Sequence, residues 1–353
     1  MSTMLEEIRQ QPAAIERTFK SESRNVERLR KHFETHRPRF IVLAARGTSD
    51  NAAQFGRYLL EITTGIPVSL AAPSVYTLYK AHVDLKDALV VAISQSGEST
   101  DTNLVLERAH EAGAMTIGIT NEADSALAKM CEYAFLVRAG KERSVAATKT
   151  YTGQLFSMYM LAYALGAAIK LDDLKKLADF AGAALKLESE IRTRAERYRF
   201  MRQAVVVGRG LNYANSFEFA LKLMETCYVV AERFSSADLL HGPIAMLESS
   251  FPAFVFAPPG VTWKPIRELL ERLKSIQVES LIITDRSNRE AQTDKNNVVT
   301  IPAALVRKPA IPEELFTAIP YVIPGQLFAA SLAEVKGLDP DKPRTLSKVT
   351  LTL

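Results

Sequence analysis

One strand-and-glycine pattern occurs twice in this chain, and the repetition limits the fold more than any other feature. Residues 41–47 (IVLAARG) align without a gap with residues 204–210 (AVVVGRG), and helices of similar length are expected after both glycines. Later apolar strands correspond as well: 88–93 with 253–257, 115–120 with 280–284, and 133–137 with 298–301. Repetition of this kind indicates two homologous units in tandem.

Within each unit, apolar strands alternate with amphipathic helices. In the first unit we expect strands at 40–45, 68–70, 88–93, 115–120 and 133–137, with helices at 50–63, 74–81, 100–112 and 125–130. Long helices at 151–165 and 171–197 precede the second unit. Continuous apolar strands of this kind form parallel sheets covered on both faces. We therefore predict an α/β fold of two doubly wound, flavodoxin-like parallel-sheet domains at 38–195 and 196–353, after a helical lead-in at 1–37.

Composition excludes several classes of protein. With 353 residues, 47% of them hydrophobic, the chain can bury two sizeable cores. A net charge of +4 without a long basic block argues against nucleic acid as a partner. Cys131 and Cys227 lie far apart in apolar or helical surroundings, as reduced thiols of a cytoplasmic protein do, and predict neither a disulfide nor a metal site. The N-terminus has no signal-peptide core, and the apolar stretch 155–169 is too short to span a membrane.

Hydroxyl-rich loops follow two strands of the first unit. The loop 94–100 (SQSGEST) comes after strand 88–93, and Gly47-Thr48-Ser49 comes after strand 40–45. Hydroxyls and backbone N–H groups at a helix start suit a phosphate, and ligands bind at the carboxyl ends of such strands. The loop lacks the Walker and dinucleotide spacings, so a phosphorylated sugar is the expected ligand. The alternative is that these residues only cap helices. A further motif, 144–149 (SVAATK), follows the last strand.

Acid–base candidates lie in the second unit and the tail. Lys222 and Glu225 are three residues apart on an apolar helix, which favours a buried carboxylate with a raised pKa over a surface ion pair. His241 precedes Gly242-Pro243, a rigid bend, although a lone histidine is more often structural. Lys348 belongs to the tail segment 344–348 (RTLSK), where a lysine is normally a frayed charge. The turn 208–212 has lost its hydroxyls, so its phosphate role has lapsed.

Taken together, these motifs resemble the tandem sugar isomerase (SIS) domain family. That family includes the isomerase half of glutamine:fructose-6-phosphate aminotransferase and stand-alone glucosamine-6-phosphate deaminases. The resemblance implies that the sugar phosphate is held by Gly47, Thr48, Ser49, Ser94, Gln95, Ser96 and Ser99, with the backbone around Val145 and Ala146 closing the site.

The resemblance also implies roles for the acid–base candidates. Glu225 would move a proton between C1 and C2, and His241 would open the pyranose ring. Lys348 would approach the carbonyl end of the open chain, and Lys222 would balance charge beside Glu225. A homodimer with shared active sites is implied, in which the histidine loop reaches the neighbouring subunit.

Two departures and one absence bear on the reaction. Leu240 stands where the aminotransferase pattern has lysine, and Ser99 where it has threonine. No glutaminase domain precedes the first unit of the given chain, and Met1-Ser2 offers no cysteine nucleophile. The expected reaction is therefore conversion of glucosamine 6-phosphate and water to fructose 6-phosphate and ammonia, without a cofactor. The alternatives are deglycation of a fructosamine 6-phosphate, aldose–ketose isomerisation, and a non-catalytic sugar-phosphate sensor.

Overall fold

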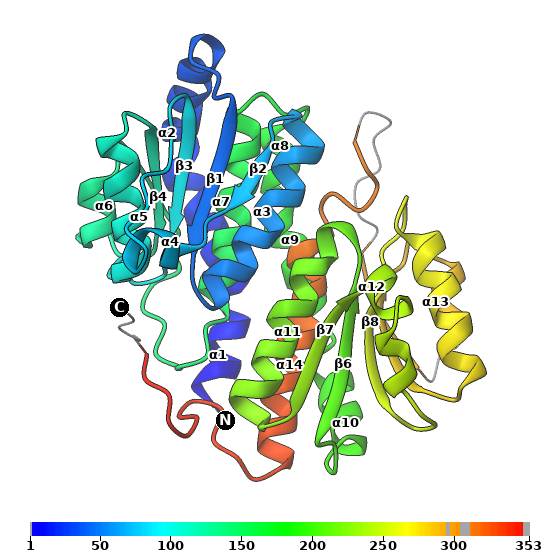
Figure 1. Ribbon diagram of the computed structural model, residues 1–353. Helices are drawn as coiled ribbons and strands as arrows, with labels where there is room; N and C mark the ends of the chain where they lie inside the picture. The colour runs from blue at the N-terminus through cyan, green and yellow to red at the C-terminus, as the bar shows by residue number, and fades with distance from the viewer. Residues whose placement is uncertain (1, 294–296, 304–310, 349–353) are drawn as a thin grey trace. The chain divides into compact units, whose positions relative to one another are not determined.

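The computed structural model describes residues 2–293, 297–303 and 311–348, and it contains two sheets of parallel strands (Figure 1). Contacts divide the described chain into two compact units. The N-terminal unit comprises residues 10–142, 149–176 and 346–348. The C-terminal unit comprises residues 2–9, 143–148 and the described part of 177–345. The units are thus not continuous in sequence, and the linear division at residues 37 and 195 stays a prediction.

The sheet of the N-terminal unit has the strand order β2-β1-β3-β4-β5. Its strands are β1 (Phe40–Ala45), β2 (Val68–Leu70), β3 (Ala88–Ile93), β4 (Met115–Thr120) and β5 (Tyr133–Leu136). β1 and β3 pair in parallel, with Ala45 opposite Ile93, so their carboxyl ends lie level. The chain runs from β1 to one side of the sheet and from β3 to the other. This is the topological switch point, where open α/β sheets bind ligands.

The helices of this unit cover both faces of its sheet. They are α2 (Gln11–Thr35), α3 (Thr48–Thr64), α4 (Pro73–Thr77), α5 (Thr100–Glu111), α6 (Ala126–Met130), α7 (Lys149–Ala164) and α8 (Leu171–Lys175). α7 packs against both α2 and α3 and is buried along almost its whole length. α4 ends four residues before the predicted helix 74–81 does, and Lys80 beyond it has a φ of 49°, which a continuing helix does not allow.

The sheet of the C-terminal unit repeats this plan with the order β10-β9-β8-β6-β7. Its strands are β6 (Gln203–Gly208), β7 (Val230–Ser235), β8 (Pro252–Phe256), β9 (Glu279–Asp285) and β10 (Val298–Ile301). The switch point lies between β6 and β8, the counterparts of β1 and β3. The predicted fold class, two doubly wound parallel sheets in an α/β chain, is therefore confirmed. β7 escaped prediction because it is an edge strand with only Ala231 and Ser235 buried.

The helical elements of the C-terminal unit surround one apolar helix, α14 (Ala318–Val335). The others are α1 (Thr3–Arg9), α9 (Leu177–Leu185), α10 (Glu188–Arg197), η1 (Gly210–Asn212), α11 (Tyr213–Cys227), α12 (Ser236–Leu240), η2 (Pro243–Met246), α13 (Trp263–Ser275) and η3 (Glu290–Gln292). Among the described residues, α14 is the one helix long and apolar enough to cross a membrane, but 89% of it is buried. Because α1, α9, α10 and α11 pack on it, we assign it to the core.

The predicted helix 171–197 is broken into three pieces. α8 ends at Lys175, α9 ends at Leu185, and α10 begins at Glu188. α8 belongs to the N-terminal unit, whereas α9 and α10 pack on α14 in the C-terminal unit. Helical periodicity alone did not distinguish one long helix from three short ones that bury different faces.

Candidate active site

The first loop of the predicted phosphate site opens α3 directly after β1. Gly47 has a φ of 56°, a left-handed conformation that favours glycine, and it turns the chain from strand to helix. Thr48 is half-buried and Ser49 is buried. The Ser49 hydroxyl accepts a hydrogen bond of 2.9 Å from Nε2 of Gln154 on α7. The loop is thereby tied to a buried helix, which fixes its position.

The second loop, after β3, is shaped by its own hydroxyls. Ser94 Oγ accepts a hydrogen bond from the Gly97 N–H at 3.1 Å, and Ser96 Oγ accepts one from the Glu98 N–H at 3.2 Å. Gly97 has a φ of 68°, and a Cβ there would collide with the Ser125 side chain. Only glycine therefore fits this turn without displacing its neighbour.

The helix-cap explanation for these hydroxyls receives no support from the helix starts. The N-cap residue of α3 is Gly47, and that of α5 is Ser99; neither makes a side-chain capping hydrogen bond. The Ser99 hydroxyl instead lies 3.0 Å from Thr102 Oγ1. Gln95, between the two loop serines, uses its carbonyl to accept the Asn121 N–H. The hydroxyls of the two loops gather at level strand ends, an arrangement suited to binding an anion.

An arginine that sequence reasoning missed adds positive charge at this switch point. Arg46 directly follows β1, and its Nη2 lies 2.9 Å from Oδ2 of Asp101 in the first turn of α5. The Asp101 side chain is 3% exposed and that of Arg46 is 50% exposed. Asp50 in the first turn of α3 has a pKa raised by burial and partly lowered again by Arg46. An arginine stands at the same place in both repeats, at 46 and 209, which is the signal that could have pointed to it.

In the C-terminal unit, Lys222 lies on α11 between two carboxylates. Its Nζ is 2.6 Å from Glu225 Oε2 and 3.6 Å from Glu218 Oε1, and its side chain is fully buried. A surface ion pair, the simpler interpretation of this spacing, is therefore excluded. The prediction of a buried carboxylate at Glu225 differs from the structure, however. The fully buried carboxylate is that of Glu218, while the Glu225 side chain is 22% exposed. Glu218 was missed, although its spacing of four residues from Lys222 is visible in the sequence.

This arrangement gives Glu225 a fixed orientation at the surface. A buried ammonium requires carboxylate partners to offset its desolvation. Glu218 and Glu225 together provide them, and the short contact to Lys222 holds one oxygen of Glu225 in place. The partly exposed carboxylate remains accessible to a ligand. A held, accessible carboxylate is the arrangement that a general base requires.

His241 ends α12 in an exposed position. Its backbone N–H donates to the carbonyls of Ala237 and Asp238, and Gly242 after it has a φ of 148°, which confirms the predicted bend. Leu240 and Met246 on either side are large apolar residues with 44% and 45% of their surface exposed. The imidazole thus lies at an exposed bend that is flanked by exposed apolar side chains.

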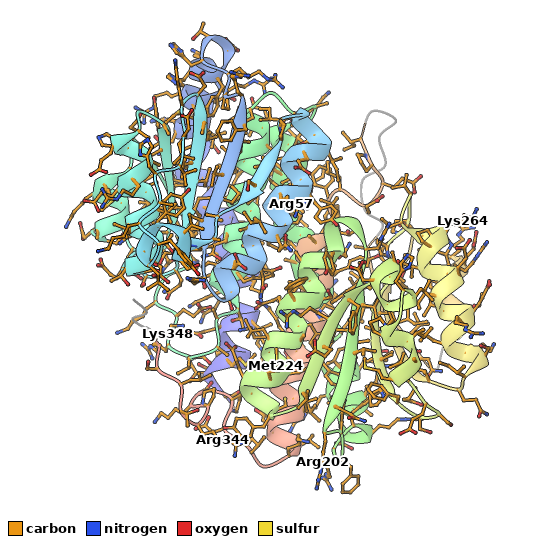
Figure 2. The ribbon with its side chains drawn as sticks, viewed as in Figure 1. Arg57, Arg202, Met224, Lys264, Arg344 and Lys348 are labelled. Atoms are coloured by element: carbon orange, nitrogen blue, oxygen red, sulfur yellow. The ribbon has the colours of Figure 1, made fainter. Side chains whose placement is uncertain are left out.

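The C-terminal tail is anchored rather than frayed over the residues that the structure describes. The Asp341 carboxylate accepts the N–H groups of Thr3 and Met4, both at 2.7 Å, and its carbonyl accepts the Val145 N–H at 3.3 Å. The Arg344 guanidinium lies 4.2 Å from the ring centroid of Tyr228, the residue that ends α11. Figure 2 labels Arg344 and, further along the tail, Lys348.

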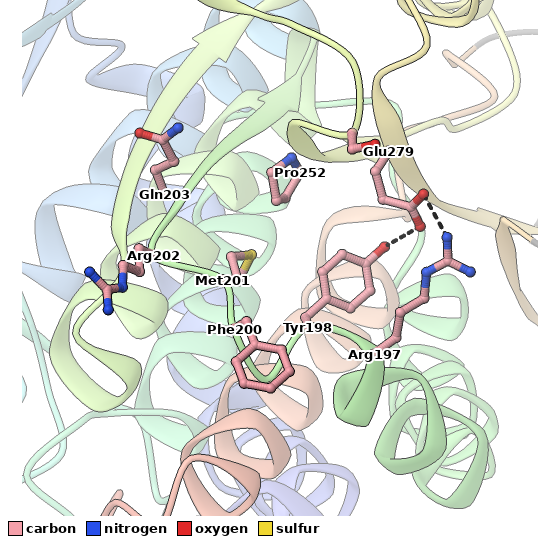
Figure 3. Close-up of a pocket in the computed structure, with 9 residues that line it drawn as sticks. Arg197, Tyr198, Phe200, Met201, Arg202, Gln203, Pro252 and Glu279 are labelled. Carbon is pink, nitrogen blue, oxygen red and sulfur yellow. Dashed lines mark hydrogen bonds and ion pairs between the residues drawn. The ribbon is translucent and has the colours of Figure 1, made fainter.

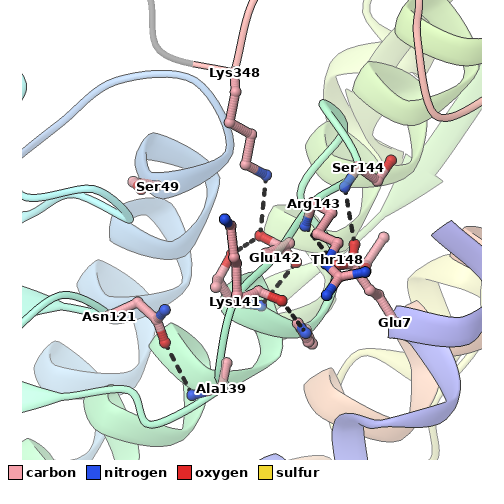
Figure 4. Close-up of polar contacts among 12 residues, drawn as sticks. Glu7, Ser49, Asn121, Ala139, Lys141, Glu142, Arg143, Ser144, Thr148 and Lys348 are labelled. Carbon is pink, nitrogen blue, oxygen red and sulfur yellow. Dashed lines mark hydrogen bonds and ion pairs between the residues drawn. The ribbon is translucent and has the colours of Figure 1, made fainter. Parts of the chain in front are cut away.

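Lys348 lies in the N-terminal unit, with the hydroxyl loops. Its Nζ is 3.6 Å from Oε2 of Glu142, and Figure 4 shows the side chain pointing at that carboxylate. The N-terminal unit therefore contains the loops 47–49 and 94–100 together with Lys348. The C-terminal unit contains Val145, Ala146, Lys222, Glu225 and His241.

Other features of the structure do not overlap with these residues. Cys131 and Cys227 are free thiols whose pKa values are raised by burial, that of Cys227 to about 11. Among the described residues, no group of three His, Cys, Asp or Glu side chains could hold a metal ion.

A cavity of about 620 Å³ in the C-terminal unit, lined by Tyr198, Arg202 and Glu279, lies at the amino ends of the strands (Figure 3). It contains none of the predicted site residues.

Comparisons with known proteins agree with this architecture. The family model described as "SIS domain" matches residues 36–164 and 199–332. The glutamine–fructose-6-phosphate aminotransferases (isomerizing) of Pyrococcus horikoshii and Aquifex aeolicus are each 33% identical over 98% of this chain. The chain spans 57% of the length of these two relatives.

Solved structures show the same fold. The C-terminal domain of the aminotransferase from Francisella tularensis has a TM-score of 0.86 and 28% identity, covering 97% of this chain and 98% of that one. Glucosamine-6-phosphate deaminase from Thermotoga maritima has a TM-score of 0.76 and 21% identity, covering 99% of this chain and 100% of that one, a likeness of fold alone. Since the family model covers most of the sequence in two tandem segments, the chain belongs to the SIS domain family.

Proposed function

We propose that this protein is an amino-sugar phosphate deaminase that isomerises its substrate, converting glucosamine 6-phosphate and water to fructose 6-phosphate and ammonia. The observation that carries the proposal is the group on α11. Buried Lys222 holds Glu225 in one orientation while leaving its carboxylate accessible. A carboxylate of this kind can take a proton from a carbon next to a carbonyl group and return it to the neighbouring carbon.

In this proposal the N-terminal unit anchors the phosphoryl group. Thr48, Ser49, Ser94, Ser96 and Ser99 supply hydroxyls at adjacent strand ends, and Arg46 adds a positive charge beside them. Anchoring the end of the substrate that does not react fixes the orientation of the end that does, and orientation is a large part of the rate enhancement that such a site can supply.

The proposed reaction assigns a step to each acid–base residue of the C-terminal unit. His241 assists opening of the pyranose ring, which exposes the C1 aldehyde. Glu225 removes the proton from C2 and delivers it to C1, while the amine loses one proton and the aldehyde oxygen gains one to become the C1 hydroxyl. The amine-bearing C2 is then an imine. Water adds to this imine, the C2–N bond breaks, and ammonia leaves with fructose 6-phosphate as the other product.

The relatives' names support the choice of substrate. The aminotransferases that match this chain are named for fructose 6-phosphate, amino-group transfer and isomerisation. A solved structure of the same fold is named for deamination of glucosamine 6-phosphate. Both names involve an amino group and a hexose 6-phosphate, the chemistry proposed here.

A second candidate is a different reaction of ketose or amino-ketose phosphates on the same scaffold. Leu240 favours it, because this residue is 44% exposed beside His241 and stands where the aminotransferase pattern has a lysine. A leucine there changes the charge that meets the substrate. Deglycation of a fructosamine 6-phosphate and simple aldose–ketose isomerisation are the two forms that this candidate takes.

The test is release of ammonia from glucosamine 6-phosphate by the purified protein, with Glu225→Gln as the control. We expect ammonia and fructose 6-phosphate in equal amounts, and a loss of about 10²–10⁴-fold in kcat for the variant. A free amino acid from a fructosamine 6-phosphate, or isomerisation without ammonia, would establish the second candidate instead. Binding of sugar phosphates without turnover of any of them would identify a sensor and defeat both.

We further propose a homodimer with shared active sites, supported by the exposed apolar residues Leu240 and Met246 around His241. Two inactive variants, Glu225→Gln and His241→Asn, should restore activity when mixed and allowed to exchange subunits. Restoration is expected because half of the mixed dimers' sites then have both native residues. A mixture as inactive as its components, despite exchange, would show that each site uses one chain only.

A further inference from the structure

The C-terminal lysine faces a buried carboxylate that no part of the proposed reaction uses. Lys348 Nζ lies 3.6 Å from Glu142 Oε2; the Glu142 side chain has no exposed surface, and that of Lys348 is 27% exposed (Figure 4). A carboxylate removed from water in this way is costly unless charge and hydrogen bonds offset the loss. The Lys348 ammonium therefore pairs with a buried negative charge, which fixes its position more firmly than that of an ordinary surface lysine.

Glu142 is itself held firmly by the start of α7. The backbone N–H and the hydroxyl of Thr150 both donate to its carboxylate. Buried Lys149 donates to the carbonyl of Lys141 at 2.7 Å and to Gln10 Oε1 at 2.8 Å. The segment that carries Glu142 is therefore fixed to α7 on both its side-chain and its backbone side.

The same face of α7 also reaches the predicted phosphate site. Thr150 and Gln154 are four residues apart and so lie on one face, about 6 Å apart along the helix. Thr150 holds Glu142, and Gln154 donates to Ser49 Oγ at 2.9 Å. One turn of α7 thus connects the partner of Lys348 with the loop that opens α3.

We propose that Glu142 is a positioning residue that docks Lys348, and with it residues 346–348, in the N-terminal unit that carries the hydroxyl loops. The inference rests on the proposed function, together with the place that the family resemblance implies for Lys348, at the carbonyl end of the open-chain sugar. Glu142 acts through Lys348 and does not itself contact the substrate. Its negative charge holds the ammonium in place, and Thr150 and Lys149 hold Glu142.

A double-mutant cycle with Glu142→Gln and Lys348→Met tests this role, with kcat for ammonia release as the first readout. In the wild-type background, Glu142→Gln should lower kcat about tenfold, within the range of coupling found for contacting residues. In the Lys348→Met background, the same substitution should have almost no effect. Equal losses in both backgrounds would mean that Glu142 acts independently of Lys348, and would overturn the proposal.

The matched control is Glu22→Gln in the same unit. Glu22 is also a buried carboxylate, 1% exposed, and is paired with Arg138 at 3.3 Å. Its substitution removes a comparable buried charge, but it should combine additively with Lys348→Met. If Glu142→Gln fails to fold, Thr150→Val, which removes one donor to the Glu142 carboxylate, takes its place in the cycle.

The second readout is amide hydrogen exchange of residues 346–348, which requires no activity. Exchange there should be faster in Glu142→Gln and in Lys348→Met than in the wild type, and unchanged in Glu22→Gln. Unchanged exchange in both of the first two variants would overturn docking, whatever the kinetics. If the wild type releases no ammonia, the proposed function fails, and the exchange data alone decide whether the tail is docked.

Discussion

The topological switch points of the two units have the same backbone conformation but different side chains. Gly47 and Gly210 are 163 residues apart and both have a φ of 56°. Gly97 and Gly260 are also 163 residues apart, with φ values of 68° and 95°. The same two turns therefore follow the same two strands in each unit. What separates the units is the side chains that these turns carry.

In the N-terminal unit the positions after the second strand carry two hydroxyls, whereas in the C-terminal unit the corresponding positions are apolar and a carboxylate from another segment lies against the turn. Ser94, Gln95 and Ser96 correspond to Ala257, Pro258 and Pro259 at the same spacing. A Cβ on Gly260 would collide with the buried Glu314 carboxylate, which therefore lies against this turn. An anion would meet negative charge there. The comparison indicates that one repeat kept the anion-binding loops and the other kept only their scaffold.

The largest effect expected from this difference is that of alanine at the two loop glycines. Gly97→Ala forces a Cβ into the Ser125 side chain at a positive φ, which displaces the hydroxyl loop. We expect KM for glucosamine 6-phosphate to rise about 100-fold, since displacements of about 1 Å can have effects of this size. Gly260→Ala should lower the Tm in a thermal melt but leave KM unchanged. Equal effects on KM would break the comparison.

The next effect concerns single hydroxyls at the two sites. Ser99→Ala removes a hydroxyl of the N-terminal loop and should raise KM about tenfold, the scale of a lost hydrogen bond to a charged group. Thr262→Val is the matched control, because Thr262 corresponds to Ser99 in the other repeat and is buried. Steady-state kinetics at fixed ionic strength measure both. A rise in KM for Thr262→Val would show that the C-terminal loop also binds substrate.

The two corresponding arginines allow a test of charge. Arg46→Met should raise KM about threefold to tenfold at low salt and less at high salt, because salt screens interactions of half-exposed charges. Arg209→Met, on the corresponding turn, should change KM little at any salt concentration. The measurement is KM as a function of ionic strength for both variants. The same salt dependence in each would remove the distinction between the two turns.

The smallest effect is on stability, at Glu314. Burial raises the pKa of its carboxyl above the ordinary value of 4.5. A carboxyl with a raised pKa in the folded state favours folding while it is protonated, and this contribution is lost as pH rises through the folded-state pKa. Glu314→Gln removes that loss, so its Tm should exceed that of the wild type by about 2–4 °C at pH 7 and match it near pH 4. An equal difference at both pH values would rule out titration of Glu314 as the cause.

Elements that show a distinctive local pattern of residues could be predicted from the sequence alone. Fully buried strands such as 88–93 are continuous apolar runs, so their positions were predictable from composition alone. β7 was missed because an edge strand with exposed Glu232 and Arg233 has no such run. α14 was missed as well, although it is the apolar helix around which four others pack in the C-terminal unit.

The same distinction applies to the residues of the candidate site: those in local motifs could be predicted, and those defined by distant partners could not. Glycine turns and hydroxyl loops lie within a few residues of each other, and their motifs were recognisable. Glu142, Glu218 and Tyr228 have roles that depend on partners: Lys348 for the first, Lys222 for the second and Arg344 for the third. The partners of Glu142 and Tyr228 lie more than 100 residues away in sequence, so no local pattern could reveal them.

The most direct test of the difference between the two repeats is a crystal structure with glucosamine 6-phosphate bound. The account predicts phosphoryl oxygens within hydrogen-bonding distance of Ser94, Ser96 and Ser99 on the N-terminal unit, and no phosphoryl group near Gly260. A phosphoryl group bound at the turn of the C-terminal unit, or away from both, would contradict it.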